Sequence, residues 1–290
     1  LIGILSSTPN IEIKLKGDHS LNKRSMKKLI SLMSEFGAQF YPQKKYNFPL
    51  KLVSSNMPVG VRYEAGVSAQ LKSAVILAAL NAFGNTEIIE KYKSRDHSEN
   101  LLSKNIQSIK IFKGKNKIIK VFGKKFLKPL DVEVPGDPSS AAFFVALTIL
   151  NENSYLKIKN VGLNPTRIGF YDLLKKHGAK IKFKNLRKTN NEVIGDIIVR
   201  SCKIKPIQAP KEFYVKATDE YPIMFVLSAL TIGTSVFKGI GDLANKESNR
   251  IKEMQKILKQ VGVKSKFSKD QLKIFGKTLL INKNKKIKVG

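Results

Sequence analysis

The sequence DLLKKHGA at residues 172–179 joins the end of an amphipathic helix, a glycine and the start of a strand. Gly178 stands where a helix C-cap in the left-handed region is wanted. The same plan occurs in KLISLMSEFGA at residues 28–38 and in KILKQVGV at residues 256–263. A degenerate copy ends near residues 101–105, with Asn105 in place of the glycine. The chain is therefore expected to repeat one α/β unit.

Three further segments are rich in small and apolar residues and precede a turn and a short strand. They cover residues 68–80, 139–150 and 219–230. Each is apolar nearly all round, so we expect these helices to be buried inside the protein rather than to lie on its surface. The two kinds of helix together predict an α/β fold built from repeated subdomains, four of which are visible. Ordinary α/β alternation without true repeats is the alternative.

The composition is typical of a soluble globular protein. The chain has 290 residues, 42% of them hydrophobic, which is enough for one large or two medium domains. The longest apolar runs, residues 141–150 and 223–232, are too short to span a bilayer, so no membrane association is expected. The single cysteine, Cys202, excludes a disulfide framework and predicts a cytoplasmic location. The three histidines lack the spacing of metal ligands.

The formal net charge of +31 first suggests a nucleic-acid-binding protein. However, 46 of the 53 basic residues are lysine and only seven are arginine, the residue best suited to reading phosphates and base edges. The lysines are scattered and often alternate with Ile and Phe, as at residues 181–184, which is typical of solvated strand faces. A lysine-biased composition therefore explains the charge better than nucleic-acid binding does.

Two short stretches indicate chemistry. Asp219 and Glu220 stand at the start of an apolar helix, and Lys246 and Arg250 follow later, four residues apart. This spacing predicts that the two cations share one helical face, with Glu247 beside them. A base near a pair of cations suits an anionic substrate that must lose or gain a proton. The plainer interpretation of Asp219 and Glu220 is a helix N-cap followed by a first-turn acid.

Seven motifs occur in the order found in one enzyme family. They are GDHSLNKR at residues 17–24, SAQLKSA at 68–74, SRDHSE at 94–99, VPGDPSSAAF at 134–143, NPTRIG at 164–169, DEYP at 219–222 and KESNR at 246–250. Through these motifs the chain resembles the 5-enolpyruvylshikimate-3-phosphate (EPSP) synthases over essentially its whole length. A single motif could arise by chance, whereas seven in order make the resemblance specific.

The resemblance implies the enolpyruvyl transferase fold, an α/β fold of two domains, each made of repeated βαβαββ units around inward-facing helices. The family's boundaries would place residues 1–134 in a first domain and residues 135–290 in a second, both incomplete. The active site would lie in the cleft between the two domains. Closure of that cleft on substrate would exclude water and strengthen electrostatic interactions.

The resemblance also implies a reaction in the shikimate pathway, which leads to chorismate and the aromatic amino acids. The enolpyruvyl group of phosphoenolpyruvate is transferred to the 5-hydroxyl of shikimate 3-phosphate, and phosphate is released. The reaction passes through a tetrahedral intermediate and uses no metal or organic cofactor. The implied partners are these two small molecules, with no nucleic acid, and the implied state is a monomer.

Roles for individual residues follow from the resemblance. Asp219 is similar to the carboxylate that accepts the 5-hydroxyl proton, and Glu247 to the second acid/base group. The expected contacts of shikimate 3-phosphate are Ser68, the Ala69 backbone amide, Gln70, Ser94, Asp219 and Lys246. The expected contacts of phosphoenolpyruvate are Arg24, Gln70 and Arg250.

Other motif residues are expected to be structural. Arg95 and His97 lie next to Ser94 and rank below it as contacts of the substrate phosphate. Ser139 and Ser140 are expected to form a tight turn and a cap where the two domains join.

The chain departs from the family pattern in several places. Ser25 replaces a usual Pro and loosens the turn after Arg24. Ala244 and Asn245 replace a usual Arg-Val pair, and Asn249 replaces an Asp. The family's motifs beyond both ends are missing, so we expect an internal fragment with little or no turnover.

Two other functions stay open. One is that of the related enolpyruvyl transferases that act on UDP-N-acetylglucosamine. These enzymes normally use a cysteine on a mobile loop, whereas Cys202 lies in the strand-like segment 197–202. The other is a non-catalytic anion-binding or RNA-binding repeat protein, which the net charge would suit.

Overall fold

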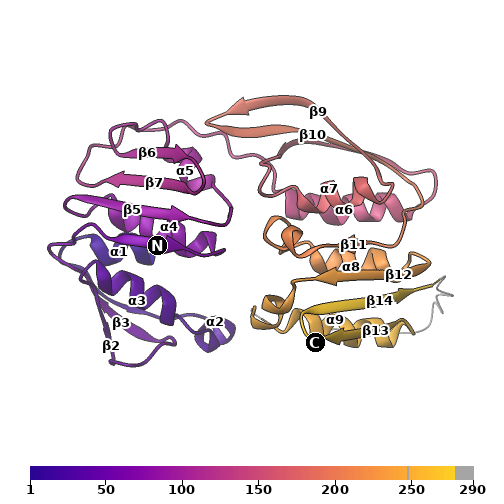
Figure 1. Cartoon of the computed structure of the whole chain (residues 1–290), viewed down its shortest axis with the longest axis horizontal. Coiled ribbons are helices and arrows are strands. Elements are labelled where there is room, and N and C mark those ends of the chain that lie inside the picture. The colour runs from indigo at the N-terminus through magenta and orange to yellow at the C-terminus, as the bar shows by residue number, and fades with distance from the viewer. Residues whose placement is uncertain (247, 278–290) are drawn as a thin grey trace. The chain divides into compact units, whose positions relative to one another are not determined.

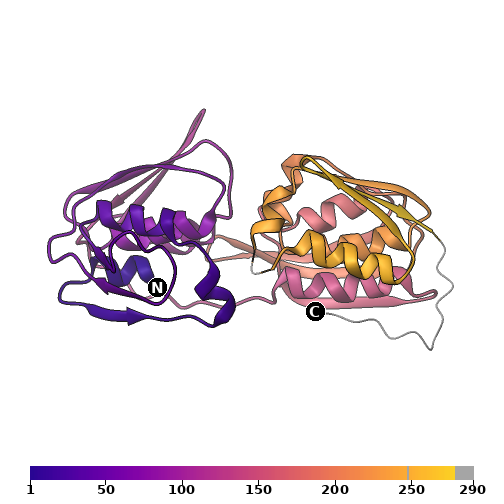
Figure 2. The ribbon, with the colours of Figure 1, turned by 90° about the horizontal axis from the view of Figure 1, so that it is seen from below.

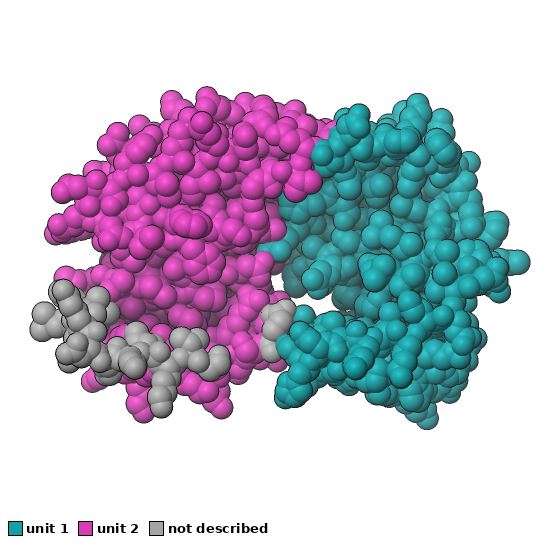
Figure 3. Space-filling model, turned by 180° about the vertical axis from the view of Figure 1, so that it is seen from behind, with its two compact units in different colours: residues 1–132 teal, residues 133–290 magenta. Residues whose placement is uncertain are grey.

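The computed structural model describes residues 1–246 and 248–277 (Figure 1). The chain divides into two compact units, Leu1–Val132 and Glu133–Gly290, which Figure 3 shows in separate colours. Each unit has its own cluster of buried apolar side chains. We describe each unit by itself.

Unit 1 contains two small sheets and the helices that pack on them. The first sheet is antiparallel with strand order β1-β3-β2, and the second has the order β4-β5-β7-β6, in which only β4 and β5 are parallel. The elements are α1 (Ile2–Ser7), β1 (Glu12–Leu15), α2 (His19–Lys23), α3 (Lys27–Glu35), β2 (Gln39–Tyr41), β3 (Leu50–Val53), β4 (Arg62–Ala65), α4 (Ala69–Ala79), β5 (Asn85–Glu90), α5 (His97–Leu102), β6 (Ile109–Lys113) and β7 (Lys117–Phe122).

Unit 2 repeats this plan. Its sheets have the orders β8-β10-β9 and β11-β12-β14-β13, and β11 and β12 are again the parallel pair. The elements are α6 (Pro138–Leu150), β8 (Tyr155–Gly162), α7 (Gly169–Lys176), β9 (Lys180–Thr189), β10 (Glu192–Arg200), β11 (Gln208–Ala209), η1 (Lys211–Lys216), α8 (Tyr221–Ala229), β12 (Gly233–Lys238), η2 (Gly241–Asn245), α9 (Arg250–Gln260), β13 (Lys264–Ser268) and β14 (Gln271–Gly276).

The matching strand orders confirm the repeated α/β architecture. In both units an inner helix is followed by a strand, an amphipathic helix and further strands, and the series then runs a second time. Figure 2 shows the helices of each unit lying together, with the strands along the outside. Simple α/β alternation would not produce the same strand order twice.

The predicted helix ends are confirmed at three glycines. Gly37, Gly178 and Gly262 follow α3, α7 and α9 with φ values of 92°, 96° and 74°, a region that glycine enters without the steric cost of a side chain. The degenerate copy ends differently, because Asn105 does not adopt a positive φ. Its buried side chain instead accepts a hydrogen bond from the backbone N–H of Lys128 at 2.8 Å. The Asn105 N–H still donates to the Leu102 carbonyl at the end of α5 at 2.8 Å, and its side chain fixes a later loop.

The inner helices α4, α6 and α8 are confirmed as elements, but their burial differs. In α8 the side chains of Met224 and Phe225 are fully buried. In α6, Phe143, Phe144 and Leu147 are 54%, 60% and 59% exposed, so the prediction that this helix is buried all round is wrong. One side of α6 packs against β8, β10 and α8, and its other side remains open in the part of unit 2 that the structure describes. Among the described residues, no helix is long and apolar enough to cross a membrane.

Candidate active site

Asp219 and Arg250 form an ion pair in unit 2. The Arg250 Nη1 donates to Asp219 Oδ1 at 3.3 Å, and the two side chains are 23% and 39% exposed. The structure therefore brings together a carboxylate and a cation that lie far apart in the sequence. The N-cap position of α8 belongs to Glu220, whose side chain makes no cap hydrogen bond. The N-cap interpretation of Asp219 is wrong, and its carboxylate is directed to Arg250.

Lys246 does not share a helical face with Arg250, contrary to the prediction from their spacing. Helix α9 begins at Arg250, because the side chain of Asn249 caps it by accepting from the backbone N–H of Lys252 at 3.0 Å. Lys246 precedes this cap in extended backbone, with φ −81° and ψ −164°. Asn249, which stands where the family usually has Asp, still supplies the oxygen that a cap needs. Glu247, the expected second acid/base group, lies outside the described residues.

Asp242 holds Lys246 in place. The Lys246 Nζ lies 2.7 Å from Asp242 Oδ2, which also accepts a hydrogen bond from the Tyr214 hydroxyl at 2.7 Å. Burial raises the pKa of Tyr214 and the Asp242 carboxylate adds to this, so the phenol stays a hydrogen-bond donor. Sequence reasoning missed Asp242, although its i,i+4 spacing to Lys246 was a usable signal.

Three of the sequence motifs meet in one cluster at the starts of α6 and α8. The Nη2 of Arg167 donates to Asp137 Oδ1 at 2.9 Å and to Ser139 Oγ at 2.6 Å, and the Ser139 hydroxyl donates to the buried Glu220 carboxylate. Asp137 also caps α6 by accepting from the Ser140 N–H at 2.8 Å. The expectation that Ser139 and Ser140 form the turn and cap is wrong, because both lie in the first turn of α6 and Asp137 is the capping residue. Since Glu220 directly follows Asp219, this cluster fixes the backbone that carries the candidate base.

The electrostatics of Asp137 agree with this arrangement. Burial works to raise the pKa of the Asp137 carboxyl, but the N–H and hydroxyl of Ser140 and the charge of Arg167 outweigh it and lower the pKa. Asp137 is therefore ionised near neutral pH, and its hydrogen bonds to Ser140 are charge-assisted.

In unit 1, Ser68, Ala69 and Gln70 form the start of α4. Ser68 is the N-cap, and its Oγ accepts from the backbone N–H of Leu71 at 3.4 Å. Ala69 and Gln70 follow in the first turn, where backbone N–H groups point out of the helix, and the Gln70 side chain is exposed. Such a helix start favours anions through its unpaired N–H groups and the helix dipole.

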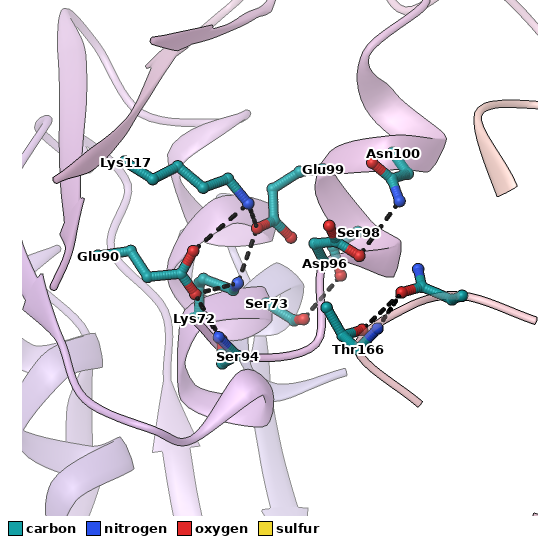
Figure 4. Close-up of polar contacts among 11 residues, drawn as sticks. Lys72, Ser73, Glu90, Ser94, Asp96, Ser98, Glu99, Asn100, Lys117 and Thr166 are labelled. Atoms are coloured by element: carbon teal, nitrogen blue, oxygen red, sulfur yellow. Dashed lines mark hydrogen bonds and ion pairs between the residues drawn. The ribbon is translucent and has the colours of Figure 1, made fainter. Parts of the chain in front are cut away.

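Ser94 is placed differently from what its expected role needs. Its side chain is 2% exposed, and its hydroxyl donates to Glu90 Oε1 at 2.7 Å (Figure 4). The hydroxyl hydrogen is therefore directed into the protein. Arg95, ranked below Ser94 from the sequence, is the more accessible of the two side chains.

Arg24 directly follows the short helix α2. The carboxylate of Asp18 caps this helix by accepting from the Leu21 N–H at 2.7 Å, and the Arg24 N–H donates to the Leu21 carbonyl at 3.1 Å. Ser25, which replaces the family's Pro, accepts from the Lys27 N–H at 3.4 Å. The hydroxyl of Ser25 thus supplies a hydrogen bond within the turn where the family has a proline ring.

Comparison with known proteins identifies the family of the chain. The model of the family "EPSP synthase (3-phosphoshikimate 1-carboxyvinyltransferase)" matches residues 1–287. The 3-phosphoshikimate 1-carboxyvinyltransferase of Zymomonas mobilis is 37% identical over 278 residues, covering 95% of this chain and 61% of that protein. The enzyme of the same name from Novosphingobium aromaticivorans is 39% identical over 279 residues, covering 95% and 63%.

Solved structures give the same result. The EPSP synthase of Acinetobacter baumannii superposes with a TM-score of 0.79 at 33% identity, covering 96% of this chain and 62% of that one. The enolpyruvyl transferase NikO of Streptomyces tendae, at 15% identity and a TM-score of 0.70, shows the shared fold alone. The chain spans 61% and 63% of the length of the two curated relatives named above. Because the family model matches nearly every residue, the chain belongs to the EPSP synthase family.

Proposed function

We propose that the protein transfers the enolpyruvyl group of phosphoenolpyruvate to the 5-hydroxyl of shikimate 3-phosphate. The observation that carries the proposal is the partly exposed Asp219 carboxylate beside Arg250, in a chain that matches the EPSP synthase family over residues 1–287. A carboxylate next to a guanidinium combines a proton acceptor with a binding group for an anion.

The proposed reaction balances without an oxidant or reductant. The 5-hydroxyl oxygen adds to C2 of phosphoenolpyruvate and gives up its proton to Asp219, while a proton is added at C3. The tetrahedral intermediate then expels phosphate and loses a proton from the new methyl group, which restores the double bond. Glu247, outside the described residues, is proposed from the family resemblance as the second acid/base group.

The remaining residues are proposed to bind anionic groups. The start of α4 would hold shikimate 3-phosphate through Ser68, the Ala69 N–H and Gln70, because a helix start presents N–H donors to an anion. Lys246, directed by Asp242, would contact the same substrate. Arg24 and Arg250 would bind phosphoenolpyruvate. The domain boundary after residue 134, the monomeric state, the cytoplasmic location and the absence of a nucleic-acid partner are part of the same proposal.

The related activity on UDP-N-acetylglucosamine is less well supported. It would require a reactive cysteine on a mobile loop. Cys202 follows β10, its Sγ accepts from the backbone N–H of Lys180 at 3.3 Å, and its side chain packs against the core of unit 2. A thiol held in this way is a packing residue.

Binding of shikimate 3-phosphate is the step that tests the proposal on this chain. Titration calorimetry of the chain with shikimate 3-phosphate is expected to show saturable binding. Gln70→Ala is expected to weaken the binding about tenfold, or about 1.4 kcal/mol. The control is Gln39→Ala, an exposed glutamine of β2, which should bind as the wild type does. No binding by the wild-type chain, or equal loss in both variants, would count against the proposal.

A further inference from the structure

Two lysines and two glutamates form a buried network in unit 1 (Figure 4). The Lys72 Nζ lies 2.7 Å from Glu90 Oε1 and 2.7 Å from Glu99 Oε1, and the Lys72 side chain is 0% exposed. The Lys117 Nζ lies 2.9 Å from Glu99 Oε1 and 3.4 Å from Glu90 Oε2. Two positive charges thus face two negative charges, and the formal charges cancel.

The network joins four different elements. Lys72 lies in the first turn of α4, and its backbone N–H donates to the carbonyl of the N-cap Ser68 at 3.2 Å. Glu90 ends β5, Glu99 lies in α5 and Lys117 begins β7. The start of α4, which carries the proposed contacts of shikimate 3-phosphate, is therefore tied to the strands and to α5 through its own buried lysine.

One oxygen of Glu90 connects two segments. Besides Lys72, Glu90 Oε1 accepts from the backbone N–H of Ser94 at 3.0 Å and from the Ser94 hydroxyl at 2.7 Å. The turn at residues 91–96 and the first turn of α4 are thus bonded to the same carboxylate. Because the Ser94 hydroxyl hydrogen is used in this contact, Ser94 serves the geometry of the turn.

Stability alone gives a weak reason for such a network. Burying four charges carries a large desolvation cost, and apolar residues of the same volume often replace buried ion pairs without loss. Hydrogen bonds to a carboxylate, however, have fixed directions that apolar packing cannot supply. Fixed direction is useful where two backbone segments must present donors to one ligand.

We propose that Glu90, held by Lys72 and Lys117, is a positioning residue that locks the start of α4 to the turn at residues 91–96. Its effect on binding rests on the proposed function, because the ligand is shikimate 3-phosphate. Its effect on the two segments does not depend on any ligand. The two effects can therefore be measured separately.

The first experiment compares Glu90→Gln with Glu12→Gln. Glu12 forms an exposed ion pair with Lys51 at 2.6 Å on strands β1 and β3, in the other sheet of the same unit, so the control removes the same charge from a surface site. Amide hydrogen exchange of the free chain and calorimetry with shikimate 3-phosphate are measured on both. In Glu90→Gln, the hydrogen-bonded amides of Leu71 and Lys72 in the first segment and of Ser94 in the second should exchange at least tenfold faster, and the affinity should fall at least tenfold. Glu12→Gln should change neither.

A second variant keeps the test open if Glu90→Gln fails to fold. Lys117 is 20% exposed, so Lys117→Met is the milder change. In Lys117→Met, Glu90 keeps its contacts with Lys72 of α4 and with Ser94 of the turn. Glu99 of α5 also contacts Lys72, and Asp96 lies near position 117. Two carboxylates then share one lysine, so the acid limb of the binding profile should move to higher pH. Protonation of shikimate 3-phosphate itself would affect the wild type and Lys117→Met equally, so it cannot produce a difference between their pH profiles.

The outcomes separate the two proposals. If the wild-type chain does not bind shikimate 3-phosphate, the proposed function fails, and hydrogen exchange alone decides on Glu90. Faster exchange in both segments of Glu90→Gln, or of Lys117→Met if that variant must be used, supports the positioning role. Exchange that stays at the wild-type rate in either segment overturns it. So does wild-type affinity in a folded Glu90→Gln, or an unchanged pH profile in Lys117→Met.

Discussion

Asp219 is the residue on which the proposed chemistry depends most. Its carboxylate is neither a helix cap nor buried, and Arg250 directs it from the start of α9. The sequence identified both residues through their motifs. The contact between them could not be read from the sequence, because it depends on how α8 and α9 pack.

In a version of the protein extended to carry the family's full set of motifs, replacing Asp219 with alanine is expected to lower turnover by a factor of about 10² to 10⁴, the usual contribution of a general base. Binding of shikimate 3-phosphate should stay largely intact, because the other proposed contacts remain. The measurement is phosphate release with both substrates, alongside calorimetry. Glu152→Ala, an exposed acid after α6, is the control and should behave as the wild type does. Unchanged turnover in Asp219→Ala would remove this residue from the mechanism.

At the scale of single elements, glycine and polar caps were the most informative residues. The left-handed glycines after α3, α7 and α9 were predictable because few other residues adopt that backbone. The shared face of Lys246 and Arg250 was predicted wrongly, because Asn249 between them starts a new helix. Spacing alone cannot show where a helix begins, whereas an Asn followed by helix-forming residues can.

Asn249→Ala is expected to lower the free energy of unfolding by about 1 kcal/mol, since it removes the cap of α9. Asn249→Asp keeps an accepting oxygen and restores the usual residue of the family, so it should retain most of the stability. Denaturant unfolding followed by circular dichroism measures both. Equal losses in the two variants would mean that the cap hydrogen bond is not the cause.

The open side of α6 shows another limit of sequence reasoning. An apolar helix with small residues predicts burial, yet Phe143, Phe144 and Leu147 are more than half exposed. Periodicity reports how apolar a helix is, but it does not report which elements lie on each side of it. The buried Lys72 of α4 is the opposite case, because its ion pairs with Glu90 and Glu99 come from distant parts of the chain.

At the scale of the whole molecule, acid is expected to destabilise unit 1. Burial works to raise the pKa of Glu90, but hydrogen bonds from Lys72 and Ser94 and the charges of Lys72 and Lys117 outweigh it, so the pKa lies below its ordinary value of 4.5. A lowered carboxyl pKa contributes stability above the ordinary value, and this stability is lost as the pH falls through the folded-state pKa. The free energy of unfolding should therefore fall below about pH 4.5.

High salt separates the contribution of the buried Glu90 carboxylate to acid unfolding from that of exposed ion pairs. In about 1 M salt, where the screening length is about 3 Å, exposed pairs such as Glu64–Lys91 contribute little. The acid-induced loss should persist under these conditions and should flatten in Glu90→Gln. Acid unfolding that disappears in high salt would show that surface charges cause it.

The net charge of +31 gives a second prediction at this scale. Any retention of RNA should be lost between about 50 and 200 mM salt, as expected for contacts to phosphate alone. Filter binding with two unrelated RNA sequences measures this. Binding that survives the salt and prefers one sequence would support the alternative of an RNA-binding protein.

The equal strand orders of the two units have a consequence for ancestry. A chain that duplicates one unit carries two copies of every helix start. The inner helices α4 and α8 hold the same place in the order of elements of their units. One begins with Ser68 and Gln70, and the other follows Asp219. Divergence after duplication would explain why the start of one inner helix now carries neutral polar side chains and the other follows a carboxylate.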